Sequence, residues 1–456
     1  MDKAKVLGEN KIPSLLWKFA APSIVGNVVN VMYNIVDSIF VGYGVGEIGL
    51  AAVAIAFPVM MFLMGFGMLV GVGASTLVSI RLGEQKKNEA DIILGNAVSL
   101  ILVLVIVTTS VALWFLDPLL VASGATPDVL PYARDFVSII LLGSVFMHMT
   151  GSLNGVIQAQ GDPKTASATM VLSGIINIVL NPLLIVGLNM GIKGSAIATV
   201  IAQAASAIWV LVYFIRGNGT LRLHVKNMAM QFKIIVDIVK IGSSLFLMQI
   251  SNSVVMFLLN NGLTVYGGSL AVASFGVINR MTMLVMMPVM GLTQAAQPII
   301  GYNYGAQKYA RVLETLKLVL KIAVGVGIVG LCLLEVFAGD VIRLFNGGPE
   351  MVEIGSVGLR IFLMMLPLIC FQVIGSSYFQ AVGKAGYTII LNLLRQVILL
   401  IPLVVIMPRF FGLMGIWAAA PISDFLASIV TGVLLAWELR KLQPGERQTI
   451  TQSDPI

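Results

Sequence analysis

Long uninterrupted runs of apolar residues are the feature that most constrains how this chain can fold. Twelve such runs, separated by short polar stretches, fill most of its 456 residues, of which 58% are hydrophobic and only 11% are charged. A helix needs about 20 apolar residues to cross a bilayer, and the runs lack the alternation typical of membrane barrel strands. The sequence therefore predicts an all-α integral membrane protein with twelve transmembrane helices. Its composition excludes a soluble enzyme, a disordered chain and a nucleic-acid-binding protein.

A polar stretch near the middle of the chain divides the apolar runs into two sets of six. The predicted organisation is an N-terminal six-helix lobe (1–216), a cytoplasmic inter-lobe loop (217–233), a C-terminal six-helix lobe (234–440) and a cytoplasmic C-terminal tail (441–456).

The basic residues between the runs indicate the orientation in the membrane. If the N-terminus is cytoplasmic, 21 of the 28 Lys and Arg residues lie in or beside cytoplasmic segments, and five lie on the opposite side. Such a bias places both termini in the cytoplasm. We expect a multi-pass protein of the cell (inner) membrane.

The two halves resemble each other at an offset of 222 residues. Segment 81–86 aligns with 303–308, and segment 157–161 aligns with 379–383. Six spans per repeat is an even number, so both lobes have the same orientation, and a pseudo-two-fold axis along the membrane normal would relate them. Repeats of this kind are common in secondary transporters, which move a substrate through a cavity between the repeats.

Several motifs that would indicate another class are missing from the sequence. No Gly-rich loop ends in Gly-Lys-Ser/Thr, so the chain has no nucleotide-binding loop of its own. Its two histidines, His148 and His224, are too few for a His-ligated metal centre. We expect no cofactor and no enzymatic activity, and an ion gradient as the energy source.

Asp37 is the clearest candidate functional residue. It follows Asn30, Tyr33 and Asn34 at helical i, i+3, i+4, i+7 spacing, so the four form one polar stripe on an apolar helix. A charge in the bilayer core costs about 2.5–3.5 kcal/mol on insertion scales, so we expect such a residue to have a functional or structural role. The functional interpretation is a protonatable or cation-binding carboxylate; the alternative is a buried acid satisfied by neighbouring helices.

Two later spans offer polar groups that could join Asp37. Asn177 and Asn181 lie four residues apart before Pro182, and Thr199 lies in the next span. Carboxylate, amide and hydroxyl oxygens suit Na⁺, with Asp37, Asn177 and Thr199 as its possible ligands, or a proton relay. Hydrogen bonding between helices explains the neutral groups equally well.

The second half carries its own intramembrane charges, Asp424, Arg395 and Arg280. A structural salt bridge between Asp424 and an arginine is one interpretation, and a coupling role is the other. Flexible methionines such as Met256 and Met287 would suit a promiscuous cavity, although they are also ordinary membrane packing.

The ordered set of motifs resembles the multidrug and toxic compound extrusion (MATE) family, especially its prokaryotic branch of DNA-damage-inducible and staphylococcal multidrug members. The resemblance covers nearly the whole chain and rests on these segments: Ala21-Pro22, Met32–Asp37, Leu153–Asp162, Asn177–Pro182, Gly191–Gln203, Gln297–Ala306 and Ala420–Asp424. It implies two six-helix lobes in a V, which export amphipathic, often cationic compounds in exchange for H⁺ or Na⁺.

The resemblance also implies roles for particular residues. Asp37 corresponds to the coupling aspartate, and Asn177 and Thr199 correspond to its polar partners. Pro22 matches the proline at which the first span bends. Three further residues fall where the family lines its substrate cavity: Tyr33, Asn34 and Asn154.

One departure from the family pattern bears on the coupling ion. Asn181 stands where members often have a second acid, and its neutrality favours H⁺ over Na⁺. The second-lobe acids of another branch have no counterpart in this chain. We therefore expect coupling to rest on the first lobe.

The expected function is a cation-coupled multidrug efflux antiporter that works as a monomer by alternating access and binds small amphipathic organic substrates. The main alternative is a lipid-linked oligosaccharide flippase of the same wider superfamily, but its cavity would need several cations, and only Arg280 and Arg395 are available. A membrane-embedded enzyme is a second alternative, without a visible cluster of nucleophile, base or metal ligands.

Overall fold

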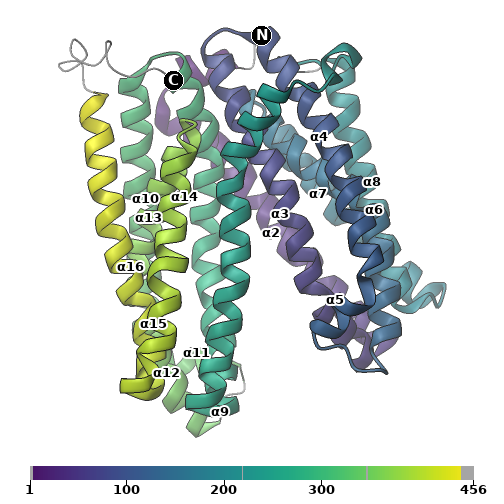
Figure 1. Ribbon diagram of the computed structural model, residues 1–456, viewed down its shortest axis with the longest axis vertical. Helices are drawn as coiled ribbons and strands as arrows, with labels where there is room; N and C mark the ends of the chain where they lie inside the picture. Colours follow the sequence, from purple (N-terminus) through teal and green to yellow (C-terminus); the bar gives the residue numbers. More distant parts are fainter. Residues whose placement is uncertain (1–3, 218, 346–347, 443–456) are drawn as a thin grey trace. The chain divides into compact units, whose positions relative to one another are not determined.

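The computed structural model describes residues 4–217, 219–345 and 348–442, and these residues form helices and connecting turns without any strand. Figure 1 shows the long helices in the order of the chain. The chain forms two compact units, unit 1 (Met1–Ile250) and unit 2 (Ser251–Ile456).

Unit 1 is built on long helices that pack in pairs. α3 packs against α6, α6 against α8, and α2 against α7. Its elements are α1 (Lys5–Glu9), α2 (Ile12–Val45), α3 (Glu47–Gly83), α4 (Lys87–Trp114), α5 (Leu116–Ala122), α6 (Leu130–Ala159), α7 (Pro163–Pro182), the π-helix η1 (Leu183–Gly187), α8 (Gly191–Arg216), the 3₁₀-helix η2 (Val225–Met228) and the first part of α9 (Phe232–Gly305).

Unit 2 holds the rest of α9 and the later helices. α10 packs against α13, and α16 packs against α12, α13 and α15. Its further elements are α10 (Tyr309–Val336), α11 (Ala338–Leu344), α12 (Pro349–Leu363), α13 (Leu366–Ala381), α14 (Ala385–Leu393), the π-helix η3 (Leu394–Leu400), α15 (Ile401–Ile406) and α16 (Pro408–Lys441).

The helices described account for twelve membrane spans. Ten helices are long and apolar enough to cross a bilayer, and the bent pair α12 and α13, with 42° between its helices, supplies one more. α9 is 74 residues long and breaks at Gly268, where φ is 66°. A straight helix of that length would measure about 110 Å, so α9 counts as two spans and the total is twelve, as the sequence predicts.

The internal repeat is visible in the backbone. α4 and α10 begin 222 positions apart, and so do α5 and α11. Left-handed backbone recurs at the same offset, at Gly46 (φ 80°) and Gly268 (φ 66°), and at the non-glycine pair Gln85 (φ 62°) and Gln307 (φ 58°). Because a non-glycine residue rarely adopts positive φ, the shared strain shows that both units are built on the same plan.

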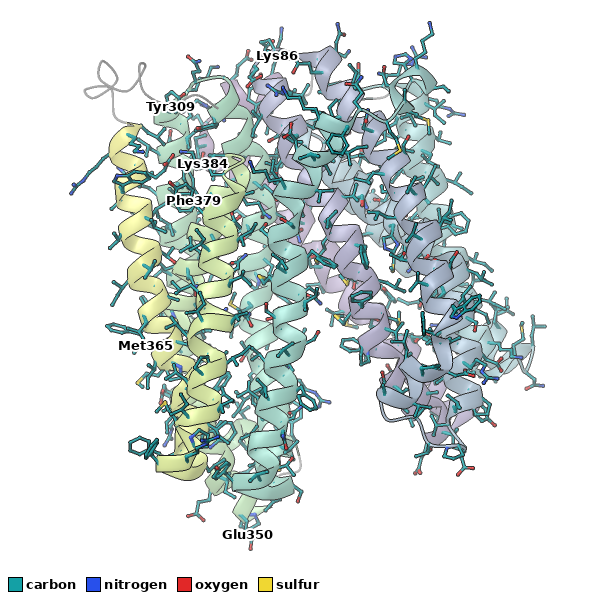
Figure 2. All side chains as sticks on the ribbon, viewed as in Figure 1. Lys86, Tyr309, Glu350, Met365, Phe379 and Lys384 are labelled. Carbon is teal, nitrogen blue, oxygen red and sulfur yellow. The ribbon has the colours of Figure 1, made fainter. Side chains whose placement is uncertain are left out.

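Alternate turns of unit 2 lie at opposite ends of its helices. Figure 2 shows Tyr309 and Lys384 near one end of the unit and Glu350 at the other. Tyr309 and Lys384 fall in turns expected on the cytoplasmic side, and Glu350 falls in a turn expected outside. The arrangement is that of helices crossing one layer in alternating directions.

The segment that follows α8 is held firmly against α4. Asn96 donates a hydrogen bond to the carbonyl oxygen of Asn227 (3.1 Å) and accepts one from the backbone N–H of Gln231 (2.6 Å). Asp91 accepts another from the backbone N–H of Arg222 (2.8 Å). These side chains satisfy backbone groups that no regular element pairs, so the connection is part of unit 1.

Candidate functional site

Asp37 lies on α2 and is joined to two other helices by hydrogen bonds. Its Oδ1 accepts a bond of 2.8 Å from Nδ2 of Asn181 on α7 and a bond of 2.6 Å from Oγ of Ser195 on α8. Among the described residues, no Lys, Arg or His forms an ion pair with Asp37. The negative charge is therefore stabilised by neutral donors alone.

The hydrogen-bond chain continues away from Asp37. Nδ2 of Asn181 also donates to Oδ1 of Asn177 (3.0 Å), and Nδ2 of Asn177 donates to Oγ1 of Thr199 (3.1 Å). The four residues chosen from the sequence as the coupling set thus meet in one network that links α2, α7 and α8. These four residues, together with Ser195, form the coupling cluster.

Ser195 is the member that sequence reasoning missed. It is fully buried and shares a face of α8 with Thr199, four residues later, so helical spacing could have identified it. Small hydroxyl residues are common in membrane helices, and nothing in the sequence alone separates this serine from those that bond their own helix.

The buried atoms of the coupling cluster leave one acceptor without a partner. Asn177 and Asn181 are 2% and 0% exposed. Asn181 uses both hydrogens of its amide nitrogen, toward Asp37 and Asn177, and its Oδ1 is buried without a hydrogen bond. Leaving such an acceptor unpaired costs about 1–3 kcal/mol, so a proton donor or a cation that reached it would be bound favourably.

Close packing of α2 against α7 brings Asp37 within reach of Asn181. A Cβ added to Gly174 of α7 would lie 2.6 Å from Cγ1 of Val29, and one added to Gly44 of α2 would lie 2.4 Å from Cγ2 of Ile185. Only glycine permits such an approach. Gly174 therefore permits the close spacing of α2 and α7, and Gly44 permits that of α2 and η1, which directly follows α7.

The polar stripe of α2 does not act as one unit in the structure. Asn34 bonds the backbone oxygen of Asn30 (2.7 Å) and its side chain (3.3 Å), and both residues are exposed. Tyr33 and Asp37 are half-buried. Only Asp37 is drawn into the coupling cluster, whereas Asn30 and Asn34 bond to each other within their own helix.

Pro22 lies inside α2, and the helix continues through it from Ile12 to Val45 without a break. Proline removes one backbone hydrogen bond and so lowers the resistance of a helix to bending at that point. In this structure α2 is one continuous helix at Pro22, and bending at this residue stays a prediction.

The other candidate cavity residues take no part in the hydrogen bonds of the coupling cluster. Asn154 is buried on α6 and accepts a hydrogen bond from Oγ1 of Thr169 (2.7 Å). Met256 is half-buried against the apolar core of unit 2, and Met287 is half-buried on α9.

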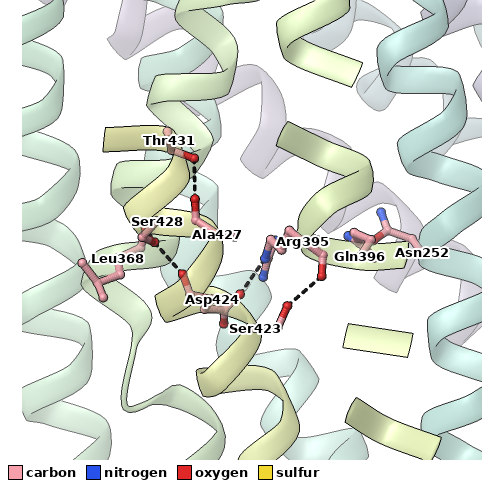
Figure 3. A network of polar contacts seen from close by, with 9 residues as sticks. All are labelled: Asn252, Leu368, Arg395, Gln396, Ser423, Asp424, Ala427, Ser428 and Thr431. Carbon is pink, nitrogen blue, oxygen red and sulfur yellow. Dashed lines mark hydrogen bonds and ion pairs between the residues drawn. The ribbon is translucent and has the colours of Figure 1, made fainter. Parts of the chain in front are cut away.

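The two intramembrane arginines of unit 2 have different partners. Nε of Arg395 on η3 donates to Oδ1 of Asp424 on α16 at 2.6 Å, and Asp424 is 2% exposed (Figure 3). Arg280 is exposed and its guanidinium lies 5.8 Å from the centre of the Phe345 ring. Of the two arginines, the structure therefore joins only Arg395 to Asp424.

The coupling cluster has no counterpart in unit 2. At the repeat offset of 222, Asp37, Asn177 and Asn181 correspond to Leu259, Leu399 and Leu403. Ser195 and Thr199, where the offset is 221, correspond to Ile416 and Ala420. Leu259, Ile416 and Ala420 are buried in the apolar core of unit 2, and Leu403 packs against it. The two units share a backbone plan, but only unit 1 carries a carboxylate at this place.

No group of three or more His, Cys, Asp or Glu side chains that could hold a metal ion occurs among the described residues. The oxygens near Asp37 are of the hard type that suits a proton, Na⁺ or water. Of these, Oδ1 of Asn177 and Oγ1 of Thr199 already accept hydrogen bonds. Each of these oxygens has a second lone pair, so a cation there would share the oxygen with the existing hydrogen bond.

Comparison with known proteins adds a family and several relatives. The MatE family model matches residues 22–183 and 244–406, two ranges that begin 222 residues apart. The multidrug export protein MepA of Staphylococcus haemolyticus is 29% identical over 92% of this chain and 94% of its own length. MepA of Staphylococcus aureus is 28% identical over 96% and 95%.

Solved structures match over almost the whole length. One described as the MATE multidrug transporter DinF-BH in complex with rhodamine 6G is 40% identical, covers 95% of this chain and 98% of that chain, and has a TM-score of 0.88. Another, an outward-facing conformation of a multidrug resistance MATE family transporter, is 26% identical, covers 97% and 99%, and has a TM-score of 0.90.

Proposed function

Since the chain belongs to the MatE family and is a transporter rather than an enzyme, we propose that it is a proton-coupled multidrug antiporter with Asp37 as its coupling carboxylate. Its cargo would be small amphipathic, often cationic organic compounds, expelled by alternating access. The relatives named multidrug export proteins and the structural neighbour solved with rhodamine 6G support this substrate class.

One observation carries the proposal. Asp37 is a carboxylate on a membrane helix, bonded to Asn181 and Ser195 from two neighbouring helices and free of any described ion pair. A purely structural carboxylate in a membrane is normally paired with a cation, because an unpaired charge is costly there. Asp37 is instead arranged so that adding a proton removes the charge and changes how three helices are joined.

The donors around Asp37 favour H⁺ over Na⁺. Asn181 presents an N–H group to the carboxylate, whereas a bound cation would need its oxygen there. The amide also adds no negative charge, so a single carboxylate would have to compensate Na⁺ alone. Protonation of the free oxygen of Asp37 needs no rearrangement of these donors.

Protonation would alter the attachment of α2 to α7 and α8. Hydrogen bonds to a charged group contribute about 1.5–3 kcal/mol and those between neutral groups about 0.5–1.5 kcal/mol. Neutralising Asp37 would therefore weaken two contacts, to Asn181 and to Ser195, by about 1 kcal/mol each. With Pro22 lowering the resistance of α2 to bending, a change of that size shifts a two-state equilibrium by about tenfold or more.

Coupling to export requires that the proton and the drug prefer different states of the transporter. The state with α2 joined to α7 and α8 through a charged Asp37 would accept a cationic compound. Protonation would favour the other state and release the compound. The protein would reside in the cell membrane as a monomer. The distribution of its basic residues supports a cytoplasmic location of both termini.

The test is transport of a cationic dye into proteoliposomes under separately imposed pH and Na⁺ gradients. We expect the pH gradient alone to drive transport and Asp37→Asn to abolish it. Asp135→Asn is the matched control, since Asp135 is an exposed carboxylate of the same unit paired with Lys193 at 3.2 Å. Normal transport by Asp37→Asn would exclude the coupling role, and transport driven only by Na⁺ would exclude the proton. Absence of dye movement in wild type would direct the search to lipid-linked oligosaccharide flipping.

A further inference from the structure

Arg395 is the one described arginine placed near the middle of a membrane span with an acidic partner. It is the eleventh residue of the continuous helix α14–η3–α15, which runs from Ala385 to Ile406. At 1.5 Å per residue, about 15 Å of helix lies on either side of it, so it sits near the bilayer midplane. Lipid headgroups do not reach that depth.

Asp424 binds only one edge of the guanidinium. Nε of Arg395 donates to Oδ1 of Asp424 at 2.6 Å, and no described residue accepts a hydrogen bond from the two terminal amino groups of Arg395. A guanidinium has five N–H donors, so four remain available. The side chain of Asp424 is 3% exposed and that of Arg395 is 25% exposed. The negative partner is thus buried and the positive donors are the accessible part of the pair.

The local backbone holds Arg395 in this position. It lies in the π-helix η3 (Leu394–Leu400), and Oγ of Ser423 donates to its carbonyl oxygen at 2.7 Å. The next residue, Gln396, donates to Oδ1 of Asn252 on α9 at 2.5 Å (Figure 3). π-turns inside helices occur frequently at functional sites. These contacts hold the backbone around Arg395, and Asp424 orients its guanidinium.

Charged donors without partners cannot face hydrocarbon at the midplane, because intramembrane arginines almost always face the bundle interior or a water-filled cavity. The planar donor pair of a guanidinium matches a carboxylate in a bidentate manner. Building on the proposed function, we propose that Arg395, held by Asp424, is a specificity-determining residue that binds the carboxylate group of transported compounds. The exporter thereby accepts amphipathic zwitterions in addition to cations.

The experiment compares two dyes that differ in one group. Rhodamine 6G is a cationic ester, and its free carboxylic acid is a zwitterion of nearly the same shape. Binding of each to detergent-purified full-length protein is measured by fluorescence anisotropy. Losing a bidentate charged contact weakens binding by about tenfold or more, so Arg395→Gln is expected to raise the Kd of the acid by that factor and the Kd of the ester less than about twofold.

Three further variants keep the result interpretable. Arg395→Lys keeps the charge without the planar fork and should give an intermediate loss for the acid. The double variant Arg395→Gln/Asp424→Asn avoids a buried unpaired carboxylate and should still bind the ester. Arg360→Gln is the matched control, because Arg360 also lies beside a carboxylate of unit 2, Glu335, but is 52% exposed.

The outcomes test the role of Arg395 separately from the multidrug function. Equal loss of both dyes in Arg395→Gln and in the double variant would mean that the ion pair is structural. Unchanged binding of the acid in all variants, or no binding of the acid by wild type, would also overturn the proposal. Failure of wild type to transport the ester into proteoliposomes would instead count against the multidrug function itself.

Discussion

The amide nitrogen of Asn181 lies 2.8 Å from Oδ1 of Asp37 and 3.0 Å from Oδ1 of Asn177, whereas the carbonyl oxygen of the same amide is buried without a partner. Asn181 therefore acts on Asp37 as a donor. A donor stabilises the carboxylate form and repels a metal cation from that oxygen. This single orientation links the geometry of the coupling cluster to the choice of ion.

Asn181→Asp should change the coupling ion. Two carboxylates in contact share one proton or bind a cation, because both cannot stay charged at low cost. We expect an Na⁺ gradient, which does not drive the wild type, to drive dye transport in this variant, with Na⁺ affinity raised by about tenfold, or about 1.4 kcal/mol of cation binding. Transport assays in proteoliposomes check this, with Asn181→Ala as the control that removes the donor without adding charge. An Na⁺ response that stays absent would show that the cluster cannot ligate a cation.

Ser195→Ala should move the pH profile of transport. It removes one of the two donors that stabilise the charged form of Asp37, so the neutral form becomes favoured at higher pH. We expect the pH of half-maximal transport to move up by about one unit, since one unit corresponds to 1.36 kcal/mol. The control is Ser206→Ala, a buried serine of α8 that donates to the backbone oxygen of Thr169. Equal profiles for both variants would argue against Ser195.

Gly194→Ala should disturb both stability and transport. A Cβ at Gly194 would lie 2.8 Å from the carbonyl carbon of Leu184, so α8 would have to move away from η1 and carry Ser195 with it. Overpacking of this kind costs about 1–3 kcal/mol. Thermal unfolding of the purified protein, followed by tryptophan fluorescence, should show a lower Tm. Gly151→Ala meets nothing within 4 Å and should leave Tm unchanged or higher.

Lys384→Met should destabilise unit 2. Nζ of Lys384 lies 2.5 Å from Oε1 of Glu438, which is 1% exposed, so the variant leaves a buried carboxylate without its cation. The expected cost is about 3–5 kcal/mol. The double variant Lys384→Met/Glu438→Gln should recover much of the loss in thermal unfolding. Arg343→Gln breaks an exposed pair with Asp340 and should change stability by less than about 1 kcal/mol. A double variant as unstable as the single one would contradict this account.

The sequence alone determined the features that depend on composition and spacing along one helix. Apolar runs long enough to cross a bilayer predicted the twelve spans, and the offset of 222 predicted two units built on the same plan. Helical spacing placed Asn177 and Asn181 on one face, and the rarity of a charge in an apolar run singled out Asp37. The boundaries of the lobes and the orientation in the membrane stay predictions.

The tertiary structure decided which helix faces meet. Spacing along a helix fixes which residues share a face, but the rotation and depth of that helix depend on packing with neighbours distant in the chain. The contact of Gly174 with Val29 sets α7 against α2, and this brings Asn181 to Asp37. By the same reasoning, Asp424 could have met either arginine, and the packing of η3 against α16 selected Arg395.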